Sequence, residues 1–166
     1  MSIVAKDNKS EYSTAPEGLW PAVCCDVIDL GIVDSQWGES HQIEIRWQLE
    51  DNDPKTERPF MVLRRYRLSL HEKSNLRPML EAWRGRKFNE EELTGFDLEK
   101  LVGVNCQVQV IHGIKSTGGT FAKVQAVVGP AKGTAKLAVR NYQRVIDRPK
   151  QQGTDSHSDA DESAPF

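Results

Sequence analysis

The residues best suited to chemistry in this sequence are cations placed beside an aromatic ring. Arg64, Arg65, Tyr66 and Arg67 are consecutive, and Arg46 lies on the polar side of an alternating segment before them. Guanidinium groups neutralise phosphates and a flat ring stacks on any base, so the combination suits a flexible polyanion such as a single nucleic-acid strand. Without an anion the clustered arginines would repel one another, which argues against a merely solvated surface.

The role of Tyr66 depends on the register of its strand, and the sequence leaves two arrangements open. In the first, the core takes four residues of the strand: Phe60, Val62, Tyr66 and Leu68. Arg65 and Arg67 then face outward with Arg46. In the second, a bulge shifts the register and Tyr66 becomes an exposed stacking platform.

Further candidates for nucleic-acid contacts lie in loops and in the last strand. Trp37 sits in a polar, glycine-containing loop, 34–40, where it has few neighbours for burial. An exposed tryptophan is unusual, so we interpret it as a stacking residue, the alternative being packing against the rim of the fold. Weaker candidates are Lys115, Phe121 and Lys123.

Periodicity predicts the elements that must position these residues. Alternation and β-branched content predict strands over 18–30, 41–50, 59–70, 103–112 and 120–129. Between the third and fourth strands, an apolar stripe at helical spacing predicts a helix that ends at Gly85; the stripe is Leu76, Met79, Leu80 and Trp83. Asn89 and Glu92 have the spacing of a capping box for a second short helix, and 97–101 could add one more turn.

This order of elements predicts a mainly β fold with a helical insertion. Three strands, a helix and two strands match an OB fold, a five-stranded Greek-key barrel whose helix lies between strands three and four. We therefore expect a flexible N-terminal arm over 1–17, an OB-fold-like domain over 18–130 and a helix or linker over 131–149. Residues 150–166 are too poor in large apolar side chains to fold, and we expect a disordered acidic tail.

Composition excludes several classes of protein. No apolar run approaches the roughly 20 residues that span a bilayer, and the first residues do not have a signal-peptide pattern, so we expect a cytoplasmic location. Three cysteines give no even disulfide framework, and four scattered histidines give no metal-ligand spacing. We expect neither a metal nor another cofactor.

Charge is unevenly distributed behind a net value of −2. Residues 58–87 carry nine Lys and Arg against two acidic residues, whereas 151–166 carry four acidic residues and no Lys or Arg. The last residues combine acids with an apolar end, a pattern suited to a basic-rimmed apolar pocket on a partner protein. The residues expected to bind a partner are Asp159, Asp161, Glu162, Pro165 and Phe166.

Two resemblances extend these expectations. The tail resembles the acidic, Pro-Phe-ended tip of bacterial single-stranded DNA-binding proteins, which docks replication and repair partners. The segments STAPEGLWPAVCCDVIDLG, LSLHEKSNLRPMLEAWRGRKF and GFDLEKLVGVNC are similar to those of a phage family of single-stranded DNA-binding proteins. This likeness covers roughly 13–130 and implies sequence-independent binding and protection of single strands in phage replication, recombination or repair, within the host cytoplasm. Oligomeric state and preference for DNA over RNA stay open.

Two other functions are compatible with the sequence. A replication or recombination adaptor would act mainly through protein contacts, and the basic third strand argues against it. A metal-dependent nuclease would use Asp26, Asp29 and Glu44, but these acids alternate with apolar residues as ordinary strand surface positions do. We therefore expect a binding protein that is not an enzyme.

Overall fold

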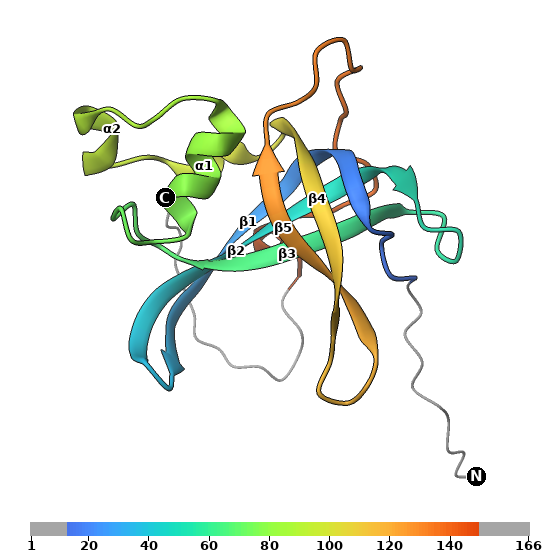
Figure 1. Cartoon of the computed structure of the whole chain (residues 1–166), viewed down its shortest axis with the longest axis horizontal. Coiled ribbons are helices and arrows are strands. Elements are labelled where there is room, and N and C mark those ends of the chain that lie inside the picture. The colour runs from blue at the N-terminus through green and yellow to red at the C-terminus, as the bar shows by residue number, and fades with distance from the viewer. Residues whose placement is uncertain (1–12, 150–166) are drawn as a thin grey trace.

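Five antiparallel strands in one sheet form the framework of the protein. The computed structural model describes residues 13–149, and in this range the sheet order is β3-β2-β1-β4-β5 (Figure 1). The strands are β1 (Gly18–Ser35), β2 (Gly38–Asn52), β3 (Pro59–Arg67), β4 (Asn105–Ile114) and β5 (Thr120–Val128). The expectation of a mainly β fold is confirmed.

β1 is the long central strand, and it joins the two halves of the sheet. Its first part, from Gly18 to Val23, pairs with β4, and the part from Ala22 onward pairs with β2. Two register shifts interrupt the second ladder, one of them just before Gly31, which has φ of 71°. The predicted end of the strand near Gly31 was wrong. The register shift accommodates the positive φ of this glycine, and the strand continues to Ser35.

Strict alternation along β2 separates a core face from an outer face, as its sequence predicts. The apolar residues of this strand, Ile43, Ile45, Trp47 and Leu49, are all buried. Trp47 packs against Trp83 of the helical insertion with ring centroids 6.0 Å apart. The polar residues therefore project from the opposite, outer face of the sheet.

β3 follows the first of the two predicted registers. Val62 and Tyr66 are buried, while Arg65 pairs across the ladder with Glu44 and Arg67 with Gln42. Tyr66 is thus a core residue and not an exposed platform. The strand ends at Arg67, three residues earlier than predicted.

The helical insertion covers one end of the sheet. α1 (Leu76–Arg84) buries the predicted apolar stripe and ends at Gly85, whose φ of 80° is the left-handed conformation favoured by glycine. α2 (Glu90–Thr94) begins with the predicted capping box between Asn89 and Glu92. A short 3-10 helix, η1 (Leu98–Leu101), leads into β4, and α1 lies against β5 (Figure 1).

The segment after β5 is extended and crosses the outer face of β1 and β2. Of the two alternatives left open by the sequence, a helix or a linker, it contains only one short 3-10 helix, η2 (Val145–Asp147). The amide of Asn105 binds both backbone polar groups of Leu137, at 2.7 and 2.9 Å. Gln48 binds those of Arg140 in the same way, at 2.8 and 2.5 Å. We call residues 137–148 the strap.

Residues 13–17, at the end of the predicted N-terminal arm, also contact the folded part. Ala15 is buried, and the Ser13 N–H donates to the Asp53 carboxylate at 2.8 Å. His112 binds the carbonyl of Ala15 and the carboxylate of Glu17. The remainder of the arm, and the tail residues from 150 onward, lie outside the described residues.

Candidate nucleic-acid interface

The outer face of β3 presents a row of two apolar side chains followed by two cations. Met61 and Leu63 are 42% and 43% exposed, and the side chain of Arg65 is 62% exposed. Arg67 is also exposed and completes the row. Period-two geometry places all four side chains on one face, where they form a surface that is both cationic and apolar. We call these four residues the β3 row.

One buried carboxylate is shared by two guanidinium groups beside the β3 row. Glu44, on β2, is 4% exposed and accepts from Arg46 Nε at 2.6 Å and from Arg65 Nε at 3.2 Å. The three groups together keep one positive charge. Glu44 holds the guanidinium of Arg65 in a fixed place at the surface, which lowers the entropy cost of using it to bind an anion.

Arg64 and Tyr66 lie on the inner side of β3 and contact each other. The Arg64 guanidinium stands 5.1 Å from the centroid of the Tyr66 ring, and its Nη1 donates to the Val124 carbonyl of β5 at 3.2 Å. Burial raises the pKa of Tyr66 to about 12. Arg64 therefore links β3 to β5, and Tyr66 is not available for stacking unless it leaves the core.

Trp37 stands at the tip of the β1–β2 hairpin. The turn is tighter than the predicted loop, because β1 and β2 pair as far as Ser35 and Gly38. The Ser35 hydroxyl braces it by accepting from the Trp37 N–H. The Trp37 side chain is 83% exposed, in the manner expected of a stacking residue. Arg67, the last residue of β3, pairs with Gln42 of β2, and the turn lies on the far side of Gln42. The hairpin tip therefore extends beyond the cationic end of the β3 row.

The other predicted residues lie on the β4–β5 hairpin. Lys115 is exposed at its tip, and Phe121 and Lys123 share the outer face of β5. The Phe121 ring lies over Gly113 of β4, where a Cβ atom would come within 2.6 Å of it. Lys123 adjoins Val124, whose carbonyl accepts from Arg64, so it lies where β5 approaches β3, although the two strands are opposite edges of the sheet.

The strap covers the part of the outer face that contains Arg46. Asp26, on β1, is 1% exposed and accepts from Tyr142 Oη at 2.6 Å, Arg144 Nε at 2.9 Å and the Val145 N–H at 2.9 Å. Arg46 Nη1 reaches Tyr142 Oη at 3.5 Å. Arg46 is thus half-covered and bound to its own neighbours, in contrast to the open β3 row.

The three acids considered for a nuclease are each engaged within the fold. Asp26 binds the strap, Glu44 binds two arginines, and Asp29 contacts His41 Nε2 at 2.5 Å. Within residues 13–149, no group of three or more His, Cys, Asp or Glu side chains is arranged to hold a metal ion.

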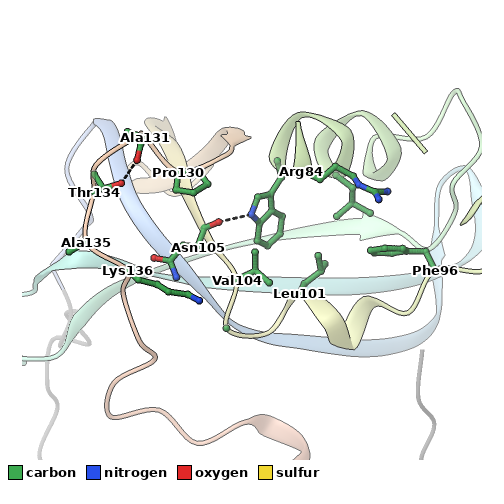
Figure 2. A pocket seen from close by; sticks show the side chains of 13 residues that line it. Arg84, Phe96, Leu101, Val104, Asn105, Pro130, Ala131, Thr134, Ala135 and Lys136 are labelled. Atoms are coloured by element: carbon green, nitrogen blue, oxygen red, sulfur yellow. Dashed lines mark hydrogen bonds between the residues drawn. The ribbon is translucent and has the colours of Figure 1, made fainter. Parts of the chain in front are cut away.

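A separate cavity of about 550 Å³ lies at the helical end of the molecule (Figure 2). Its lining is largely apolar and includes Trp83, whose indole N–H donates to the Asn105 carbonyl at 2.9 Å. Arg84 is at its edge, stacked over the Phe88 ring at 4.5 Å and bound to Glu92 at 2.6 Å. Lys136 also lines this cavity, but none of the lining residues belongs to β3, so the cavity lies apart from the β3 row.

Three residues of the candidate interface were not predicted from the sequence: Met61, Leu63 and Tyr142. Counting by twos from Arg65 would have placed Met61 and Leu63 on the arginine face, so a signal was present. For Tyr142 there was none, because the strap is positioned by contacts far away in the sequence.

Comparison of the sequence with protein-family models and with curated proteins finds no match. No helix within residues 13–149 has the length and apolar character that crossing a bilayer requires.

Proposed function

We propose that this protein binds single-stranded DNA without sequence preference through the β3 row and the neighbouring hairpin tips. The observation that carries the proposal is the β3 row itself, which alternates with the core residues of its strand. Exposed Met61 and Leu63 offer apolar contact to unstacked bases, while Arg65 and Arg67 offer charge to phosphates. A duplex hides its base faces, so this mixture favours single strands.

The topology supports an OB fold as the scaffold for this binding. In an OB fold the first strand is shared by both halves, the helix lies between the third and fourth strands, and the third and fifth strands meet to close a barrel. Here β1 pairs with both β2 and β4, the helical insertion precedes β4, and Arg64 bridges β3 to β5. Trp37 and Lys115 would then stand on the two loops that flank the binding face of such a barrel.

In this proposal the protein coats single strands formed during phage DNA replication or recombination. The resemblance of three segments to a phage family of single-stranded DNA-binding proteins supports that role. The acidic tail would recruit partner proteins, as its resemblance to the bacterial tip implies, and its residues lie outside the described part of the chain.

The test is the binding of fluorescently labelled single-stranded DNA, with duplex as competitor, across a salt series. We expect the full chain to prefer the single strand and to lose affinity steeply with salt. The double variant Arg65→Ala/Arg67→Ala should bind about 10-fold more weakly at low salt, and the slope of log K against log salt should fall by about two.

The matched control is Arg86→Ala/Lys87→Ala, which removes two exposed charges after α1, away from β3. If both double variants lose affinity equally, binding is a general charge effect and the β3 row is not the site. Absence of single-strand binding by the unaltered chain would exclude the proposal and favour the adaptor function.

A further inference from the structure

A second, larger cavity opens at the apolar end of the β3 row. Its volume is about 1000 Å³, at the upper end of the range for ligand sites. It lies between the β2–β3 connection and the strap, and its lining includes Arg46, Arg58, Met61, Tyr142 and Arg148. Met61 belongs to both the cavity and the β3 row, so the two surfaces are continuous.

Two exposed guanidinium groups in this cavity are available to an anion. Arg58 and Arg148 form no ion pair with any other residue in the range 13–149. The carboxylates in the lining are those of Asp53 and Glu57. The Asp53 carboxylate accepts hydrogen bonds from the backbone N–H groups of Ser13 and Lys55, both at 2.8 Å, so its charge is partly compensated.

The aromatic ring in the cavity is held in one orientation. Tyr142 is anchored through its hydroxyl, which donates to buried Asp26. The Arg148 guanidinium stands 5.4 Å from the ring centroid, and its Nε donates to the Gln143 carbonyl at 3.1 Å. A ring fixed in this way can meet a base with little further loss of side-chain entropy.

The backbone around the cavity contains both non-glycine residues of the described chain that have positive φ. Glu57 has φ of 60° and Asn141 has φ of 49°. Asparagine tolerates this region, but glutamate rarely occupies it. Such conformations cluster at binding sites, where the surrounding structure maintains them.

We propose that this cavity is a subsite for one unstacked nucleotide of the bound strand. The base lies beside Tyr142 and Met61, and its phosphate lies between Arg58 and Arg148. The inference rests on the proposed function, and it adds that the strand leaves the β3 row at Met61 and enters the cavity with one base turned away from its neighbours.

The experiment is photo-crosslinking of the full chain to a thymidine oligonucleotide that carries iodouracil in place of single thymines. Mass spectrometry of the digested product should place a crosslink on the tryptic peptide that contains Tyr142. In parallel, Arg58→Ala and Arg148→Ala should each weaken single-strand binding about 3- to 10-fold and lower the salt slope by about one. The matched control, Arg86→Ala, should bind like the unaltered chain.

Two variants are needed because Arg148 packs on Tyr142, whereas no other residue in 13–149 holds the Arg58 side chain through a hydrogen bond. A loss of affinity in Arg58→Ala, with an unchanged melting temperature, supports the subsite independently of the strap. If the chain binds single strands but crosslinks only at Trp37 or Leu63, and both variants bind normally, the subsite is excluded and the proposed function stands. If the unaltered chain does not bind single strands, both proposals fail.

Discussion

Among single residues, Asp26 is the most buried charged group of the described chain. It is 1% exposed, yet it satisfies three donors from the strap, and Arg144 completes its own pairing with Glu99 at 2.7 Å. A buried carboxylate with this many partners stabilises a fold mainly because removing it leaves the partners unsatisfied.

We therefore expect Asp26→Asn to lower the free energy of unfolding by about 2–4 kcal/mol, since Arg144 would lose a buried counter-charge. Urea denaturation followed by circular dichroism measures the change. The control is Asp29→Asn, on the same strand, whose side chain is 35% exposed and pairs with His41. This exposed pair should contribute less than about 1 kcal/mol, and equal losses in the two variants would contradict the role assigned to Asp26.

For Trp37 we predict that substitution changes single-strand binding and leaves stability unchanged. Because its side chain is 83% exposed, Trp37→Ala should leave the unfolding midpoint nearly unchanged. It should weaken single-strand binding by about 1–3 kcal/mol if the ring stacks on a base. Fluorescence anisotropy at matched salt measures this loss, and unchanged affinity would remove Trp37 from the interface.

At the scale of elements, the strap is held by side chains that bind its backbone. Gln48 is 3% exposed and supplies one donor and one acceptor to Arg140. Its amide thereby satisfies backbone polar groups of a segment that has no place in the sheet.

Gln48→Ala should therefore loosen the strap and cost about 1–3 kcal/mol, because the Arg140 N–H and carbonyl lose their partners. Limited trypsin digestion should then cut faster after Arg140 and Arg144. Gln42→Ala, at an equivalent outward position on β2, serves as control and should digest at the original rate. Equal digestion of the two variants would contradict the clamping role of Gln48.

The elements that could be predicted from sequence are those specified by neighbouring residues. The alternation of β2, the apolar stripe of α1 and the capping box of α2 are local patterns, and the structure contains each of them. The course of the strap could not be predicted, because it depends on Asn105, Gln48 and Asp26, which lie 32 to 118 positions earlier.

The same division applies to the candidate interface. Exposure of Trp37 and the outward direction of Arg65 and Arg67 follow from turn and strand patterns. The contact of Arg64 with β5, the shielding of Arg46 and the cavity around Tyr142 depend on how β5 and the strap approach β2 and β3. These are long-range contacts that periodicity along one segment does not specify.

For the molecule as a whole, the three buried thiols make the free energy of unfolding fall as the pH becomes alkaline. Burial raises the pKa of Cys25 from 9.0 to about 12, and burial also raises the pKa values of Cys24 and Cys106. The folded state therefore keeps these protons at a pH where the unfolded chain releases them. The stabilisation is complete below about pH 9 and is lost as the pH rises through the folded-state values.

We expect the free energy of unfolding to fall by about 1 kcal/mol per thiol between pH 9 and pH 10. Urea titrations at a series of pH values measure this slope. Cys25→Ala removes one of the three contributions and should give a shallower decline above pH 9, whatever its effect at neutral pH. A slope identical to that of the unaltered chain would show that Cys25 is not protected from ionisation.

The distance along the chain between Asp26 and its partners also sets an order of events during synthesis. Asp26 leaves the ribosome early, but Tyr142, Arg144 and Val145 follow 116 to 119 residues later. Until they emerge, the carboxylate of Asp26 must stay hydrated and the outer face of the sheet must stay open. The nascent sheet thus becomes a finished domain only when the last described residues have been translated.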